Sequence, residues 1–158
     1  MELWLGSFNL GLIYAFLAIG VFITSRILDF PDITVDGSFT TGASVTAVLI
    51  VAGVNPLLAL LLSFLAGSLC GFVTGFIHTR FKINSLLAGI LVMTGLYSIN
   101  LHIMGKSNIP LMNQPTIFSY INNLKSNLPS DVFTGLFMLV IVFFTWILVS
   151  LFFKTDLG

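Results

Sequence analysis

Charged side chains are scarce in this sequence. Its 158 residues include only six Lys or Arg and six Asp or Glu, whereas 57% are hydrophobic. Soluble globular domains carry charge on about a quarter of their residues, so this composition excludes a water-soluble domain. Four long hydrophobic stretches contain no charged residue at all, at residues 3–25, 37–79, 83–105 and 132–153. The lack of charge therefore indicates an integral membrane protein.

Groups suited to catalysis or metal binding are also few. Cys70 is the only cysteine, which excludes an internal disulfide and favours a small packing residue. The two histidines, His78 and His102, lack the spacing of a metal-binding pair, and neither a phosphate-binding loop nor a serine nucleophile motif occurs. We therefore expect no enzyme activity, no metal, no cofactor and no nucleic-acid partner. Any dependence on ATP must come from another protein.

The hydrophobic stretches have the length of membrane helices. A hydrocarbon core about 30 Å thick is crossed by roughly 20 helical residues, and the stretch 37–79 is about twice that long. Gly53 and Pro56 break it into two helices. We expect an all-α, polytopic membrane helix bundle that forms a single transmembrane domain. Its five helices are predicted at residues 3–25, 37–53, 56–77, 84–104 and 132–153.

Basic residues near the helix ends predict the orientation. Short loops on the cytoplasmic side of a membrane are enriched in Lys and Arg. Alternation of five helices places Arg26, Arg80, Lys82 and Lys154 on one side, and Lys106 and Lys125 on the other. This distribution favours an N-terminus outside the cell and an extracytoplasmic loop at residues 106–131. That loop contains either a short helix lying flat at the membrane surface, starting at Thr116, or irregular structure throughout.

Two local patterns predict helix caps and helix packing. Asp36, Asn55 and Asn84 each precede a hydrophobic run, and their side chains can accept hydrogen bonds from the free N–H groups of a first helical turn. Gly67, Gly71 and Gly75 recur every four residues and form a groove that another helix can approach closely. These glycines favour a packed bundle over an isolated membrane anchor.

Polar residues inside the predicted helices are candidates for a solute pathway. Asp36, Thr40, Thr41 and Asn100 are the ones we select, because a polar helix end or amide within a bundle can face a passage. The alternative is structural. Asp36 can act only as a cap, and Thr hydroxyls can bond to carbonyls of their own helix.

Three segments together resemble a known family. They are residues 28–39 (LDFPDITVDGSF) with Gly42 and Ala43, residues 84–91 (NSLLAGIL), and residues 100–108 (NLHIMGKSN). They resemble permeases of bacterial ABC importers, specifically the branched-chain amino acid permease family. Within it, the chain is most similar to the uncharacterised branch called putative tryptophan or tyrosine transporters. The resemblance extends over essentially the whole chain.

The resemblance implies a permease in the bacterial inner membrane that imports a small solute, an amino acid. Its partners would be a second permease copy, a cytoplasmic ATPase and an extracytoplasmic substrate-binding protein. Family members are nearly twice as long, and their ATPase-docking helix follows the region that Lys154 begins. The resemblance therefore implies the N-terminal half of such a permease. The alternative is a non-transporting helix-bundle remnant or packing partner. Sequence alone does not identify the solute.

Overall fold

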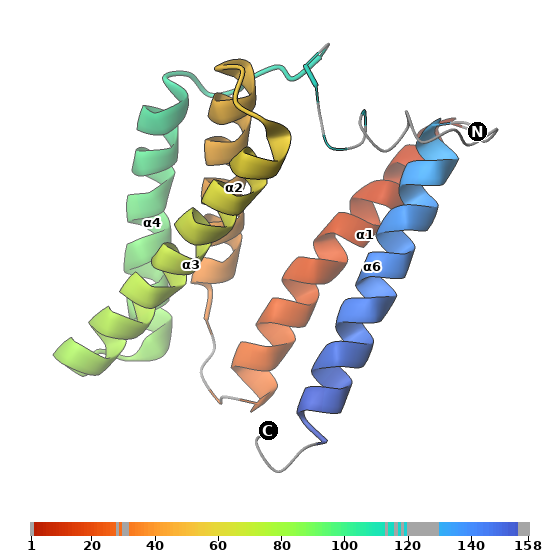
Figure 1. Cartoon of the computed structure of the whole chain (residues 1–158). Coiled ribbons are helices and arrows are strands. Elements are labelled where there is room, and N and C mark those ends of the chain that lie inside the picture. The colour runs from red at the N-terminus through yellow and green to blue at the C-terminus, as the bar shows by residue number, and fades with distance from the viewer. Residues whose placement is uncertain are drawn as a thin grey trace. The chain divides into compact units, whose positions relative to one another are not determined.

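The computed structural model describes residues 2–27, 29, 32–112, 114, 115, 117, 119 and 130–154. Most of these residues are helical (Figure 1). The helices are α1 (Glu2–Phe22), the short π-helix η1 (Ile23–Ile27), α2 (Thr34–Val51), α3 (Pro56–Phe81), α4 (Ser85–Met104) and α6 (Ser130–Phe152). No strand occurs among the described residues. The all-α prediction is therefore confirmed.

Among the described residues, five helical segments are long and apolar enough to cross a membrane. They are Leu3–Arg26, Thr34–Val51, Pro56–Phe81, Ser85–Met104 and Val132–Phe152. This confirms the prediction of a polytopic membrane protein with five spanning helices. The external position of the N-terminus stays a prediction. The surface helix considered for loop 106–131 falls mostly outside the described residues, as does its expected start at Thr116.

Asparagine side chains lie at the starts of α3 and α4. Asn55 Oδ1 accepts a hydrogen bond from the Leu57 N–H at 3.0 Å, and Asn84 Oδ1 accepts one from the Leu86 N–H at 2.9 Å. Each bond satisfies an N–H that has no partner within the first turn. Pro56 occupies the first helical position of α3, where its missing N–H removes no helical hydrogen bond.

Helix α2 starts at Thr34, earlier than the expected Gly37. The Asp32 carboxylate accepts a hydrogen bond from the Thr34 N–H at 2.8 Å. Asp36 consequently lies inside the first turn, is exposed, and is not the residue that caps the helix. Its negative charge is still favoured there by the positive end of the helix dipole. An Asp bonded to the N–H two residues later forms a local turn, and this feature explains the earlier start.

Helix α3 also extends beyond the expected end at residue 77. It continues to Phe81 and stops at Lys82, whose φ of 53° places its backbone in the left-handed region. A left-handed residue is a common way to end a helix. His78 Nδ1 lies 2.7 Å from the Ile83 carbonyl oxygen, within hydrogen-bonding distance, and ties the turn to the helix. The connection to α4 is therefore short and well defined.

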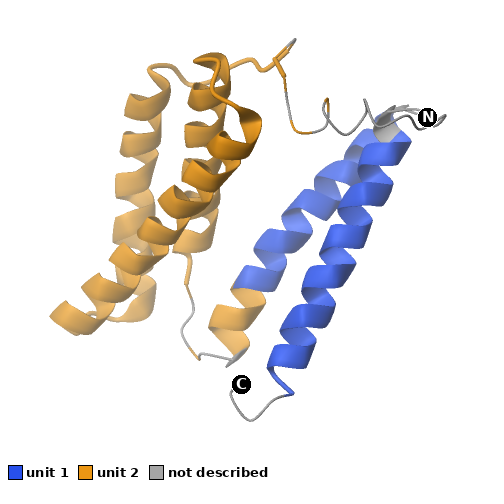
Figure 2. Cartoon of the chain, viewed as in Figure 1, with its two compact units in different colours: residues 1–20, 121–158 blue, residues 21–120 orange. Residues whose placement is uncertain are grey.

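The chain divides into two compact units (Figure 2). Unit 1 contains residues 1–20 and 121–158, and unit 2 contains residues 21–120. In unit 2, α2 packs against both α3 and α4, and α3 and α4 contact each other less extensively. In unit 1, α1 and α6 lie side by side. The expectation of a single transmembrane domain stays a prediction.

Glycines bring α2 and α4 into close contact in unit 2. A Cβ added to Gly37 would lie 3.2 Å from Leu96 Cδ1, and a Cβ added to Gly89 would lie 3.3 Å from the Ile33 backbone nitrogen. Both separations are shorter than ordinary van der Waals contact. Small residues of this kind allow membrane helices to approach closely. These two positions therefore fix the alignment of α2 with α4.

A single glycine has the same function in unit 1. A Cβ added to Gly135 of α6 would lie 2.5 Å from Oδ1 of Asn9, which is on α1. The Asn9 side chain therefore occupies the space that a larger residue at position 135 would need. Gly135 is buried, so the two helices meet where one of them has no side chain.

Candidate functional site

The buried faces of unit 2 carry polar as well as apolar side chains. α2, α3 and α4 all contribute to one set of buried polar residues, hereafter the polar seam. Its members are Thr34, Thr41, Ser44, Ser63, Thr74 and Asn100. The outward faces carry large apolar side chains instead, such as Phe64 at 72% exposure and Phe72 at 69%. Apolar side chains suit contact with lipid, whereas polar groups inside a membrane bundle mark packing sites or solute routes.

A hydrogen bond between two helices lies at one end of the seam. Thr74 Oγ1 of α3 donates to Thr34 Oγ1 of α2 at 3.0 Å, and it also lies 3.1 Å from the Cys70 carbonyl oxygen. Both threonines are fully buried. Bonds of this kind join membrane helices with about 0.6 kcal/mol on average. At this end of the seam, α2 and α3 are therefore joined by the Thr74–Thr34 hydrogen bond.

The middle of the seam contains hydroxyls that bond to their own helices. Thr41 donates to the Gly37 carbonyl oxygen at 2.9 Å. Ser44 donates to the carbonyl oxygen one turn before it at 2.8 Å, and Ser63 does so over a shorter spacing at 2.8 Å. Each hydroxyl oxygen keeps lone pairs that can accept a further hydrogen bond. These groups can therefore interact with a polar solute without first breaking the protein structure.

Asn100 differs from the other members of the seam. It is 4% exposed, and its side-chain oxygen Oδ1 has no hydrogen-bond partner among the described residues. A buried acceptor left without a donor costs about 1–3 kcal/mol. Such a group in a folded protein calls for an explanation, and a functional contact or a bound water or ion is among the usual ones. Asn100 is therefore the strongest individual candidate for a functional side chain.

The structure separates the four residues selected from sequence as pathway candidates. Thr41 and Asn100 belong to the seam, whereas Asp36 and Thr40 are exposed on α2. Thr40 Oγ1 donates to the Asp36 carbonyl oxygen at 2.9 Å, so its hydroxyl is satisfied within the helix. The four side chains do not share one face. Their assignment to a solute pathway stays a prediction.

Sequence reasoning did not assemble the seam as a unit. Thr34, Gly37, Thr41 and Ser44 recur at spacings of three and four, which puts them on one face of a helix. This pattern was the available signal. A helix that begins at Gly37, as the sequence predicts, does not include Thr34, so the pattern is incomplete until the true start at Thr34 is known.

Of the three glycines spaced by four on α3, only Gly67 contacts another helix in the part of the chain that the structure describes. A Cβ added to Gly67 would lie 3.6 Å from the Ser38 carbonyl oxygen on α2, in ordinary contact. Added Cβ atoms on Gly71 and Gly75 would meet nothing within 4 Å. The tighter contacts of unit 2 are at Gly37 and Gly89, which sequence analysis did not select. A role for Gly71 and Gly75 in packing stays a prediction.

A groove on unit 2 lies next to the seam. It has a volume of about 430 Å³, and side chains of α3 and α4 form its walls. The walls include Leu69, Val73, Leu96 and Ile99, and Thr41 of α2 also contributes. Cavities that bind small molecules commonly have volumes of about 300–1,000 Å³. The groove is therefore large enough for an amino acid, and Thr41 gives it a polar group.

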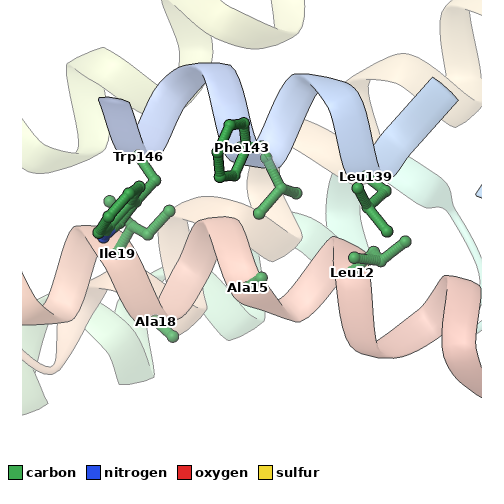
Figure 3. A pocket seen from close by; sticks show the side chains of 8 residues that line it. Leu12, Ala15, Ala18, Ile19, Leu139, Phe143 and Trp146 are labelled. Carbon is green, nitrogen blue, oxygen red and sulfur yellow. The ribbon is translucent and has the colours of Figure 1, made fainter. Parts of the chain in front are cut away.

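Unit 1 has a groove of similar size but different chemistry (Figure 3). It has a volume of about 420 Å³ and lies between α1 and α6. Ala15 and Ala18 leave space on α1, while Phe143 and Trp146 project from α6 with ring centroids 6.0 Å apart. Every lining residue is apolar, apart from the indole N–H of Trp146. This groove suits lipid or another helix better than a polar solute.

Within the described residues, no group of three His, Cys, Asp or Glu side chains could hold a metal ion. The polar seam contains hydroxyl and amide groups and no carboxylate or ammonium group. Hydroxyls and amides bind by hydrogen bonding without fixing a charge in place. The arrangement is suited to weak, reversible contact with a polar solute.

Comparisons with known proteins agree with a membrane transport role. The family model for the permease component of the branched-chain amino acid transport system matches residues 3–158. A tyrosine transport system permease protein of Clostridioides difficile (strain R20291) is 47% identical over 147 residues, which cover 93% of this chain and 46% of the relative. An uncharacterised protein of Rickettsia prowazekii (strain Madrid E) is 36% identical over 142 residues, covering 90% and 50% respectively.

The chain spans about half the length of these curated relatives. No solved structure matches it significantly. The family match covers nearly all of the chain, including α2, α3 and α4, which form the polar seam. This chain is a multi-pass membrane protein that belongs to the permease component family of branched-chain amino acid transport systems.

Proposed function

We propose that this chain is part of the transmembrane permease subunit of an ATP-driven importer for an amino acid. The observation that carries the proposal is the polar seam, because a bundle that only anchors itself in lipid does not need hydroxyl and amide groups on its buried faces. The family match and the tyrosine permease relative support the same function. The seam would form part of the solute pathway.

The proposal includes partners for this subunit. A cytoplasmic ATPase would hydrolyse ATP, an extracytoplasmic binding protein would deliver the solute, and a second permease copy would complete the pathway. The transport-system description of the family supports such an assembly. The location would be the bacterial inner membrane. The chain spans about half of the length of each of these relatives.

Solute uptake by reconstituted vesicles tests the proposal. The full-length permease that contains this chain is reconstituted with its ATPase and binding protein, and a panel of labelled amino acids that includes tyrosine is supplied outside. We expect ATP-dependent accumulation of at least one amino acid, and none with a non-hydrolysable ATP analogue. Accumulation no greater than in vesicles without the permease, for every amino acid, would overturn the proposal.

The alternative function is that of a non-transporting helix bundle which serves as a packing partner. Gly71 and Gly75 favour this reading, because they leave an uncovered strip of backbone on α3. Uptake by the unsubstituted protein separates the two functions, because a permease transports solute and a packing partner does not. If the chain is a packing partner, Gly71→Leu should also weaken its association with other membrane proteins.

A further inference from the structure

We propose that Asn100 binds the ammonium group of the transported amino acid, at the level of Thr41 in the groove between α3 and α4. This inference rests on the proposed function and goes beyond it, because it assigns one atom of the protein to one chemical group of the solute. The contact atom is Asn100 Oδ1, the buried acceptor without a partner in the described part of the chain.

The packing of α2 with α4 determines the level of Asn100. The two helices run in the same direction (Figure 1), and Gly37 of α2 lies against Leu96 of α4. One helical turn farther along, these positions are succeeded by Thr41 on α2 and Asn100 on α4. Both residues are buried, at 4% exposure each. Asn100 is therefore at the same depth in unit 2 as Thr41.

Helix α3 contributes a third polar residue at this depth. A Cβ added to Gly42, next to Thr41, would lie 3.5 Å from the Ser63 carbonyl oxygen. Ser63 is itself buried at 9% exposure, and its hydroxyl is bonded within its own helix. A layer of three polar residues from three helices thus crosses the seam. Of these three side chains, only Asn100 has a buried polar atom that makes no hydrogen bond within the described part of the chain.

The groove gives a solute access to this layer. Leu96 and Ile99 line its wall, and Asn100 follows Ile99 directly. Residues four apart on a helix differ by about 40° around its axis. A rotation of α4 by that amount would turn the Asn100 amide to the side of the helix that Leu96 now presents to the groove, one helical turn farther along. Rocking of helices against one another is common in transporters.

The chemistry of the layer selects the solute group. A side-chain carbonyl oxygen accepts hydrogen bonds, and the hydroxyl oxygens of Thr41 and Ser63 have acceptor capacity left. The ammonium group of an amino acid offers three donors and can bond to all three. The seam contains no carboxylate that would hold an ammonium group tightly. Binding is therefore specific for a donor and weak enough to permit release.

The test measures how much labelled tyrosine enters vesicles for each ATP hydrolysed by the complete importer. Asn100→Leu keeps a similar volume and removes the acceptor. We expect about tenfold less tyrosine per ATP, the effect of losing one hydrogen bond to a charged group, with folded yield unchanged. Ser98→Leu, on the exposed face of the same helix, is the matched control and should transport as the wild type does.

Two further arms keep the test decisive. If Asn100→Leu does not fold, Asn100→Ala is measured in its place and is expected to show the same loss of tyrosine yield per ATP. The analogue of tyrosine without its amino group should be transported no worse by Asn100→Ala than by the wild type. Wild-type yields of tyrosine per ATP in the Leu or Ala variant would overturn this inference alone. No tyrosine uptake by the wild type, and none of any other amino acid, would overturn the proposed function as well.

Discussion

At the scale of single residues, hydrogen bonding distinguishes the members of the polar seam. Thr74 and Thr34 are fully buried and bonded to each other across two helices. Asn100 is almost as deeply buried, and its carbonyl oxygen has no partner among the described residues. The Thr74–Thr34 bond stabilises the packing of α2 and α3. The Asn100 oxygen can still accept a hydrogen bond. The same three helices therefore contain one polar position that is bonded between helices and one whose oxygen is unbonded within the described residues.

Thr74→Val tests the structural position. The substitution preserves the shape of the side chain and removes the bond to Thr34, so we expect the detergent-solubilised protein to lose about 0.5–1 kcal/mol of stability. The measurement is the midpoint of thermal unfolding followed by circular dichroism. Thr94→Val is the matched control, because Thr94 is exposed and bonds only to carbonyls of its own helix. Equal effects of the two substitutions would contradict the assignment.

At the scale of helices, caps and close approaches determine where each element begins and which elements meet. Asn55 and Asn84 lie directly before α3 and α4, and a single carboxylate at Asp32 moves the start of α2 to Thr34. Gly37 and Gly89 then align α2 with α4. The positions that matter most for packing are therefore those where a side chain is absent.

Gly89→Ala should destabilise unit 2, because its Cβ would press on the backbone nitrogen of Ile33, which cannot move aside easily. Gly71→Ala should be neutral or stabilising, because its Cβ would meet nothing within 4 Å and alanine favours a helix by up to about 1 kcal/mol. Thermal unfolding of the two variants in detergent is the comparison. A Gly71→Ala variant as unstable as Gly89→Ala would show that the packing differs from the one described.

Asn84→Ala should weaken the start of α4 by about 1 kcal/mol, since the Leu86 N–H loses its acceptor. Hydrogen exchange of the first-turn amides of α4 should become faster while exchange in α3 does not change. Asn108→Ala is the control, because Asn108 is exposed and lies outside the helices. Unchanged exchange at Leu86 in the Asn84→Ala variant would contradict the capping role.

The helices themselves could be predicted from sequence because lipid imposes a length and a composition on every span. The absence of charge and the break at Pro56 were sufficient to find five helices. The polar seam could not be predicted in the same way, because threonines and serines occur on all faces of these helices. Which ones are buried depends on how α2 approaches α3 and α4, and that depends on close contacts at Gly37 and Gly89. Hydroxyl spacing alone does not contain this information.

At the scale of the whole molecule, the orientation in the membrane determines which end of the polar seam faces the outside of the cell. The basic residues favour an N-terminus outside, which would put the α3–α4 connection at Lys82 in the cytoplasm and Lys106 outside. The chain has one native cysteine, Cys70, which is buried, so a Cys70→Ala background allows single cysteines to be introduced. A membrane-impermeant thiol reagent added to intact cells should label Lys106→Cys and not Lys82→Cys. The reverse pattern would contradict the orientation.

The central claim is that the polar seam becomes part of an aqueous solute pathway during transport. The most direct measurement introduces Ser44→Cys in the Cys70→Ala background and follows its reaction with a small water-soluble thiol reagent, which attacks the thiolate that forms in water. We predict that Ser44→Cys is labelled while the complete importer hydrolyses ATP, and that the transported amino acid slows the labelling. Ser68→Cys, on the exposed face of α3, should stay unlabelled throughout. Failure to label Ser44→Cys while uptake proceeds would contradict the account.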